Sequence, residues 1–200
     1  MVVGLGNPGP EFAKSRHNAG ADVVALLAER HGAGRLRRVR QHAAVGEVRI
    51  AGARVALVVP TTYMNDSGNA VAPLVRRFGI QGNLLRLVVV HDELDLPPGR
   101  LQVKIGGGTA GHNGLRSVQS HLHSAEFVRV RIGVGKPPSA AAGADHVLRR
   151  PSKRDAEAIA ATIGRAADAV EVIATDGVEA AMNRFNGDGG TEPPVPPDPR

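Results

Sequence analysis

Residues 87–95 read LVVVHDELD, an apolar run that ends in a cluster of titratable side chains. Two other stretches have the same form, MVVGLGNPG at 1–9 and VALVVPTTYMN at 55–65. Short β-branched runs without polar alternation are typical of strands buried on both faces, in a parallel or mixed sheet covered by helices. Ligands of such sheets bind beyond the carboxyl ends of the strands. A single crevice is therefore expected to hold the polar residues that follow the three runs, Asn7, Asn65 and Asp92.

The rest of the chain alternates between strand and helix patterns, which is typical of an α/β fold. Strands are predicted near 1–5, 43–50, 54–59, 86–91, 101–105 and 127–134, and helices near 19–31, 67–79, 113–123, 152–174 and 177–185. A hairpin-like spacing around Ala51 and Gly52 favours a mixed sheet. The prediction is a single-domain α/β sandwich over residues 1–186, whose twisted, mixed and mostly parallel central sheet is flanked by helices. Residues 187–200 are rich in Pro and Gly and are predicted to form a disordered tail.

The chain is basic, with 25 Lys and Arg against 19 Asp and Glu and a formal charge of +6. Such a surface favours a polyanionic partner, most commonly a nucleic acid, and a solvated arginine-rich surface is the open alternative. The same two interpretations apply to the basic clusters, which comprise Arg35, Arg37, Arg38, Arg40, Arg149, Arg150, Lys153 and Arg154. With no Trp and only five Phe and Tyr, recognition of RNA by shape and phosphate would suit the chain better than base stacking.

The cellular compartment is constrained by what the sequence omits. It holds no cysteine, which excludes disulfides, thiolate metal ligands and cysteine nucleophiles and fits a reducing cytoplasm. No segment approaches the ~18 consecutive apolar residues of a membrane span. The first residues enter a strand with no basic region or apolar stretch ahead of them, so no signal peptide is expected. We therefore expect a cytoplasmic protein without a membrane partner.

Gly4, Gly6 and Gly9 match the spacing of the dinucleotide-binding fingerprint. That fingerprint needs its third glycine in the first turn of a helix. Here residues 8–10 continue a turn, and the next predicted helix begins only after residues 16–20. The acidic residue that the fingerprint requires at the end of a second strand is also missing. The pattern therefore argues against a nicotinamide cofactor. The glycines are interpreted as positions where the backbone approaches a ligand or a neighbouring strand.

Candidate catalytic groups flank the expected crevice. His17 precedes the first predicted helix, beside Asn18 as a possible N-cap, and a loop histidine is either a surface residue or a general base. An aspartate such as Asp92 can hold a histidine in one tautomer, and the pair then makes a base with a pKa near ~6.5–7. Because His91 and Asp92 point to opposite faces of a strand, they are poorly placed to bind one metal ion. The alternative to a catalytic role is structural: the polar residues 91–95 would form a hydrogen-bonded turn with the help of residues 97–99.

Residues 106–114, GGGTAGHNG, lead into a predicted helix. Successive glycines can offer N–H groups to a phosphate or an oxyanion, and a mobile flap is the alternative. Because no Gly-Lys-Ser/Thr follows, the segment is not a nucleotide-binding P-loop. Asn7, Asn65 and Asn113 each lie beside a glycine or a strand end, where an amide can bind peptide groups or hold water.

Six motifs taken together closely resemble the bacterial peptidyl-tRNA hydrolase family: GLGNPG (4–9), RHNAG (16–20), PTTYMN-x-SG (60–68), HDELDLPPG (91–99), GGGTAGHNGLRS (106–117) and RIGVGKP (131–137). Their order and spacing match the family over about residues 1–185. The resemblance implies a monomeric α/β enzyme that hydrolyses the ester joining a peptide to the 3′ ribose of tRNA and so returns free tRNA to translation. It implies neither a cofactor nor a metal.

The resemblance also implies roles for individual residues. His17 would be the base that activates water, Asp92 would orient and polarise that water, and Asn7 would line the site. The residues that would bind the peptide, or the peptide and water, are Asn65, Asn113, Met64, Tyr63 and Phe12.

The tRNA 5′-phosphate would be clamped by Lys104 and Arg131, and the cleft would be bordered by a gate and a lid. The gate loop would include Gly108, Gly111 and His112. The lid would lie near 137–150, where the segment 138–143 is short and Ala-rich.

The sequence leaves three alternatives to this function. A non-catalytic RNA-binding member of the same family is the first, and the retention of His17, Asp92 and the three asparagines argues against it. A nicotinamide-dependent oxidoreductase rests on the glycine fingerprint alone. A serine hydrolase would need a Gly-x-Ser-x-Gly elbow, which the sequence lacks.

Overall fold

A computed structural model of the chain describes residues 1–137, 139 and 143–187. The strands are β1 (Val2–Gly4), β2 (Arg37–Val39), β3 (Ala43–Ile50), β4 (Ala53–Pro60), β5 (Val88–Glu93), β6 (Leu101–Ile105) and β7 (Val128–Gly133). The helices are α1 (Ala19–Arg30), α2 (Ser67–Arg77), α3 (Asn113–Leu122), α4 (Gly143–Leu148), α5 (Lys153–Thr175) and α6 (Val178–Phe185), and the short 3₁₀ turns are η1 (Pro10–Phe12), η2 (Arg16–Asn18), η3 (Met64–Asp66) and η4 (Leu84–Arg86). None of the described helices combines the length and the apolar character needed to cross a bilayer.

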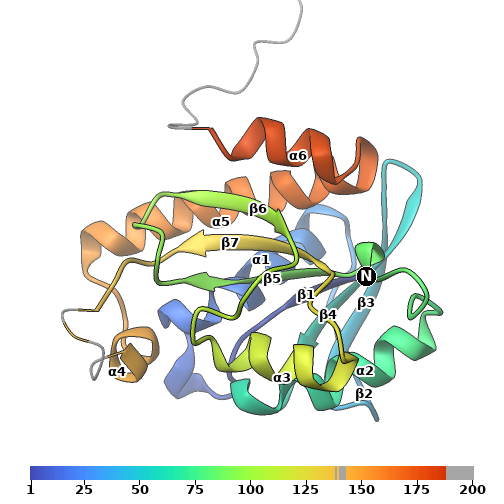
Figure 1. Cartoon of the computed structure of the whole chain (residues 1–200), viewed down its shortest axis with the longest axis horizontal. Helices are drawn as coiled ribbons and strands as arrows, with labels where there is room; N and C mark the ends of the chain where they lie inside the picture. Colours follow the sequence, from blue (N-terminus) through green and yellow to red (C-terminus); the bar gives the residue numbers. More distant parts are fainter. Residues whose placement is uncertain (138, 140–142, 188–200) are drawn as a thin grey trace, which may run out of the picture.

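The seven strands form one twisted sheet in the order β2-β3-β4-β1-β5-β7-β6 (Figure 1). The four core strands, β4, β1, β5 and β7, are parallel to one another, whereas β2, β3 and β6 add antiparallel pairs at the two edges. The predicted mixed sheet with helices on both faces is confirmed, and its parallel part is the core. The predicted hairpin at Ala51 and Gly52 joins β3 to β4, and both residues have positive φ, 46° and 85°.

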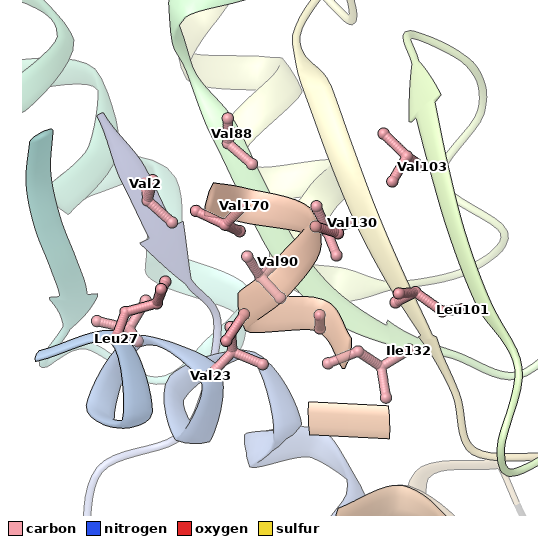
Figure 2. Close-up of a cluster of buried hydrophobic side chains, with 14 of the residues drawn as sticks. Val2, Val23, Leu27, Val88, Val90, Leu101, Val103, Val130, Ile132 and Val170 are labelled. Atoms are coloured by element: carbon pink, nitrogen blue, oxygen red, sulfur yellow. The ribbon is translucent and has the colours of Figure 1, made fainter. Parts of the chain in front are cut away.

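Both faces of the sheet are buried, which explains why the strand sequences do not alternate between polar and apolar residues. Helices α1, α5 and α6 cover one face, and α2 and α3 cover the other. Figure 2 shows Val88 and Val90 of β5 beside Val23 of α1 and Val170 of α5. Val89, between the two valines of β5, belongs to the cluster on the α2 and α3 side.

Three elements differ from the sequence-based prediction. β5 continues to Glu93, so Asp92 lies inside the strand and pairs in register with Ile132 of β7. The short strand β2 and the helix α4 were not predicted, because three or six residues carry too little periodicity to be recognised. The rejected dinucleotide fingerprint is indeed absent as a structure, since α1 begins at Ala19, well after Gly9. Of the predicted tail, only Gly187 falls within the described residues.

Gly20 sets the distance between α1 and the ends of two core strands. A Cβ atom at Gly20 would lie 2.2 Å from the carbonyl oxygen of Val90 and 2.7 Å from the backbone nitrogen of Leu5. Because no other residue fits this space, the first turn of α1 packs directly against β1 and β5. The turn η2, which precedes α1, is thereby held at the carboxyl ends of these strands.

Candidate active site

The centre of the site is a hydrogen bond between His17 and Asp92. Asp92 is the penultimate residue of β5, and His17 is the middle residue of η2. Nδ1 of His17 lies 2.9 and 3.0 Å from the two carboxylate oxygens of Asp92. Both side chains are buried. Because Nδ1–H donates to the carboxylate, Nε2 is the nitrogen of His17 that remains to accept a proton.

The charge of Asp92 tunes the basicity of His17. Burial alone would lower the pKa of His17, but the charge and the hydrogen bond of Asp92 outweigh it and raise this pKa above its ordinary value of 6.5. Burial likewise acts to raise the pKa of Asp92, yet His17 and His112 hold it well below its usual range. Asp92 is therefore ionised at neutral pH and stabilises the protonated form of His17.

His112 supplies a second hydrogen bond to the same carboxylate. Its Nε2 lies 3.0 Å from Oδ1 of Asp92. Its Nδ1 accepts hydrogen bonds from the backbone N–H groups of Gly114 and Leu115, so His112 is the N-cap of α3. Since Nδ1 accepts, the proton is on Nε2 and His112 is a neutral donor to Asp92. The first turn of α3 is thereby connected to the carboxylate that holds His17.

The spacing of these three residues resembles that of a metal site. The ligating atoms of His17, Asp92 and His112 all lie within 4.8 Å of one another, a spacing that could surround a metal ion. A metal on Nε2 of His112 would leave the proton on Nδ1, where it would oppose the two N–H groups that Nδ1 accepts. The residues therefore fit a proton-sharing network better than a metal centre.

His91 packs against the ring of His112 and is fully buried. Its Nδ1 donates to the carbonyl oxygen of Asp92 at 2.7 Å, and its ring centroid lies 5.0 Å from that of His112. Its Nε2 has no hydrogen-bond partner among the described residues. Burial, and then the neighbouring His112, lower the pKa of His91 to about 3. His91 is thus a neutral ring that supports His112 rather than a group that takes part in proton transfer.

Asn7 connects the end of β1 to the segment that follows β4. Its side-chain Oδ1 accepts a hydrogen bond from the backbone N–H of Met64 at 2.8 Å. The backbone of Asn7 is held by Asn18, whose Oδ1 accepts from Asn7 N–H and whose Nδ2 donates to Asn7 O. Asn18 occupies the N-cap position of α1, as predicted, but its side chain makes no capping bond and holds the backbone of Asn7 instead.

Two cavities adjoin His17. The first, of about 280 Å³, is lined by Asn7, Phe12, His17, Tyr63, Met64, Asn65, Asn113, Val147 and Leu148. This cavity brings together all of the residues that the sequence analysis assigned to the peptide. Tyr63 is 58% exposed, and its ring meets that of Phe12 edge to face. The second cavity, of about 440 Å³, is lined by Asp92, Gly111 and His112 among others, and both cavities share His17 and Asn113.

A buried arginine holds α4 beside the cavities. Arg16, the residue before His17, donates to the carbonyl oxygen of His146 and to the carboxylate of Asp155, at 3.2 and 3.0 Å. Arg16 is 7% exposed, so this ion pair joins the base-bearing turn to the start of α5. Val147 of α4 lines both cavities as a result. The segment 138 and 140–142 of the expected lid lies outside the described residues.

The two cations assigned to a tRNA phosphate lie on one face of the β6–β7 edge, but their surroundings differ. Lys104 is exposed and forms no ion pair within the described part of the chain. Arg131 is half-buried, and its guanidinium donates twice to one carboxylate oxygen of Glu93, at 2.8 and 3.0 Å, and once to Gln102. Lys104 is thus an available cation, whereas the charge of Arg131 is largely neutralised.

The gate loop is anchored by Arg129, which the sequence analysis did not identify. This arginine is 3% exposed, stacks over the ring of Phe127, and donates hydrogen bonds to the carbonyl oxygens of Gly107 and Gly108. Gly111, with a φ of 79°, continues the loop toward His112. The loop is therefore fixed at both ends, by Arg129 at its start and by the His112 cap at its end.

The chain is similar to known proteins over nearly its whole length. A family model described as peptidyl-tRNA hydrolase matches residues 1–193. The chain is 47% identical over 186 residues to the peptidyl-tRNA hydrolase of Frankia casuarinae, covering 93% of each chain. A crystal structure of peptidyl-tRNA hydrolase from Acinetobacter baumannii matches with a TM-score of 0.87 at 38% identity, covering 92% of this chain and 93% of that one. The chain belongs to the peptidyl-tRNA hydrolase family.

Membership of the peptidyl-tRNA hydrolase family confirms the resemblance drawn from the six motifs. Sequence reasoning identified the residues that gather around His17, but it missed several that hold them in place. Arg16 lies inside one of those motifs, yet its partner Asp155 is 139 residues away and carries no local signal. His112 was assigned to the gate, although its place between Asp92 and α3 was not recognised. Only the side-chain positions reveal these connections.

Proposed function

We propose that this member of the peptidyl-tRNA hydrolase family hydrolyses the ester between a peptide, or an N-blocked amino acid, and the 3′ ribose of tRNA. The single observation that carries the proposal is the buried His17–Asp92 pair, with Nδ1 of His17 at 2.9 Å from the carboxylate, beside a cavity lined by amide side chains. An ester has a good leaving group, so one general base and a set of hydrogen-bond donors suffice.

In the first step His17 acts as the general base. Nε2 removes a proton from a water molecule, and the resulting hydroxide attacks the carbonyl carbon of the ester. The carbonyl oxygen gains negative charge, which amide N–H groups of the site stabilise. Asp92, as a carboxylate, stabilises the histidine cation that forms.

In the second step the bond to the ribose breaks. The 3′ oxygen leaves with the bonding electron pair and takes the proton from Nε2 of His17, so the products are a free peptide and a tRNA with an intact 3′ hydroxyl. His17 returns to its neutral form, and no group of the enzyme is consumed. This sequence of proton transfers requires neither a cofactor nor a covalent enzyme intermediate.

The asparagines would bind the peptide through its backbone. Oδ1 of Asn7 is used by Met64 N–H, which leaves its Nδ2 without a partner among the described residues. Asn65 and Asn113 are exposed in the cavity, and each amide can donate to and accept from a peptide group. Backbone binding of this kind tolerates many side chains, and it disfavours an unblocked aminoacyl-tRNA, whose free amine lacks the amide.

The tRNA would lie on the β6–β7 side, with Lys104 bound to its 5′-phosphate. Arg131 is interpreted as a second, weaker contact, because Glu93 already occupies its guanidinium. Gly108, Gly111 and the loop that carries them would border the acceptor end. Function as a monomer in the cytoplasm remains the prediction made from the sequence.

The test uses an N-acetyl-aminoacyl-tRNA and its unblocked counterpart, each incubated with the protein in EDTA beside the His17→Ala variant. We expect cleavage of the blocked substrate alone, reduced roughly 10³-fold in the variant because the general base is missing. tRNA binding by the variant, measured by filter retention, should stay unchanged. Binding of tRNA without cleavage by the unmodified protein would favour a non-catalytic RNA-binding role.

A further inference from the structure

Three arginines at the outer edge of the sheet have no described partner. Arg35 lies in the link from α1 to β2, and Arg37 and Arg38 lie in β2 itself. All three side chains are exposed, and none forms a hydrogen bond or an ion pair with any part of the chain that the structure describes. Other arginines of the described residues are paired with acids, among them Arg16, Arg30, Arg54, Arg131 and Arg149. Within the described part of the chain, the cluster therefore presents three charges that no acid compensates.

These arginines line a groove that adjoins the active site. The groove has a volume of about 880 Å³, and its wall on the active-site side includes Asn7, Pro8 and Thr61. The peptide cavity is lined by Asn7, Phe12 and Tyr63 among others. Both hollows thus share Asn7 and are bounded by the same two loops, those that follow β1 and β4. Asn7 is therefore the residue at which the peptide cavity and the groove adjoin.

The position of the groove in the sheet distinguishes the peptide side from the tRNA side. β2 is the edge strand at one end of the sheet, whereas Lys104 lies on β6, the edge strand at the other end (Figure 1). The catalytic pair lies between them, on β5 and η2. The acyl and alcohol parts of an ester extend in opposite directions from the reacting carbon. If the tRNA lies toward β6, the peptide extends toward β2.

We propose that this groove, which we call the Arg35–Arg38 groove, binds the distal residues of the substrate's peptide and prefers Asp and Glu there. The proposal rests on the hydrolase function proposed above and adds a substrate preference to it. Four interstrand spacings of about 4.8 Å separate β5 from β2, about 19 Å, which an extended chain spans in about six residues of about 3.3 Å. The preferred acids therefore lie about five to seven residues from the ester.

The experiment compares peptidyl-tRNAs that carry ten-residue peptides with Glu or Gln at the fifth to seventh residues from the ester. We expect kcat/KM at low ionic strength to be about threefold higher for the Glu peptide, since exposed ion pairs are individually weak and the consecutive residues Arg37 and Arg38 point to opposite faces of β2. The preference should decline at high salt, because exposed charges are screened. In a variant that combines Arg35→Gln, Arg37→Gln and Arg38→Gln, the ratio of the two rates should fall to about one.

Two controls identify the cause of any change. A variant that combines Arg150→Gln, Lys153→Gln and Arg154→Gln removes the same charge from a second exposed basic segment, and it should keep the preference for Glu. N-acetyl-aminoacyl-tRNA is too short to reach the groove, so the Arg35–Arg38 variant should cleave it at the rate of the unmodified protein, which also verifies folding.

Other outcomes overturn the proposal. Equal rates for the two peptides with the unmodified protein would show that the groove does not bind acidic residues, while the hydrolase function would stand. If the triple variant of Arg35, Arg37 and Arg38 lost the same fraction of kcat/KM on the Glu peptide, the Gln peptide and the N-acetyl substrate, the arginines would be assigned to RNA binding instead. No cleavage of any substrate by the unmodified protein would reject the proposed function itself.

Discussion

Asp92 accepts hydrogen bonds from the buried His17 and the half-buried His112, whereas Asn65 and Asn113, which face the neighbouring cavity, are exposed. Among the described residues, Asn65 has no side-chain hydrogen bond, and Asn113 accepts one, from Arg116. The region around Asp92 is fixed by several contacts from different elements, whereas the region around Asn65 and Asn113 is open. The difference fits the demands on each: proton transfer needs one geometry for every substrate, whereas a wall that meets many peptides must accommodate different shapes.

The largest effect in the fixed region, after removal of His17 itself, is expected for Asp92→Asn. The variant keeps the shape but removes the charge that raises the pKa of His17, so kcat should fall roughly 10²-fold. His17 must be neutral to accept a proton, and in the unmodified protein the rate therefore declines as pH falls through its raised pKa. In Asp92→Asn this decline should move to lower pH. A pH–rate profile measures both effects, and an unchanged rate and profile would reject the orienting role.

A smaller effect is expected at His112, where two substitutions separate its two contacts. His112→Asn retains a side-chain acceptor for the N-terminus of α3 but loses the donor to Asp92, whereas His112→Ala loses both. We expect both variants to lower kcat about tenfold, because each weakens the hold on the carboxylate. Only His112→Ala should also lose about 1 kcal/mol of unfolding free energy, as expected for a missing cap. Urea denaturation measures the stability, and equal stabilities would contradict the capping role.

The next effect distinguishes the two cations at the β6–β7 edge. Lys104→Ala should lower kcat/KM for peptidyl-tRNA about tenfold, as expected for one lost charge-assisted contact. It should not change kcat/KM for a small ester substrate that lacks the 5′-phosphate. Arg131→Ala should lower kcat/KM less and stability by about 2 kcal/mol, because it leaves the buried Glu93 carboxylate unpaired. An equal loss on both substrates in Lys104→Ala would refute the phosphate contact.

The smallest effect is expected in the open region. Tyr63→Phe keeps the ring that meets Phe12 and removes only an exposed hydroxyl, so kcat/KM should stay within about twofold of the unmodified protein. Tyr63→Ala is the matched comparison, since it removes the ring and should raise KM more than it lowers kcat. A large loss in Tyr63→Phe would show that the peptide wall depends on a specific hydrogen bond rather than on apolar contact.

The same contrast governs what the sequence could predict. The strands follow from apolar runs that end in polar residues, a pattern that lies within short stretches of the sequence. The predicted single crevice is in fact two adjoining cavities, since Asn7 and Asn65 line one and Asp92 lines the other, and His17 lines both. The connections of Arg16, Asn18 and Arg129 could not be predicted, because each joins positions brought together only by the fold. Asn18 shows the limit most clearly, since its position at the start of α1 suggests a cap, but tertiary contact with Asn7 prevails over that local preference.

The ion pair between Arg16 and Asp155 also bears on how the protein matures during its own synthesis. His17 and Asp92 both belong to the first half of the chain, and the strands that place them are neighbours. The wall contributed by α4, and the carboxylate that secures the turn before α1, come from residues 143–155. A growing chain therefore carries its reactive pair long before the pocket around it is closed. An enzyme whose substrate is a peptide still attached to tRNA thus completes its own active site only after α4 and Asp155 have been synthesised.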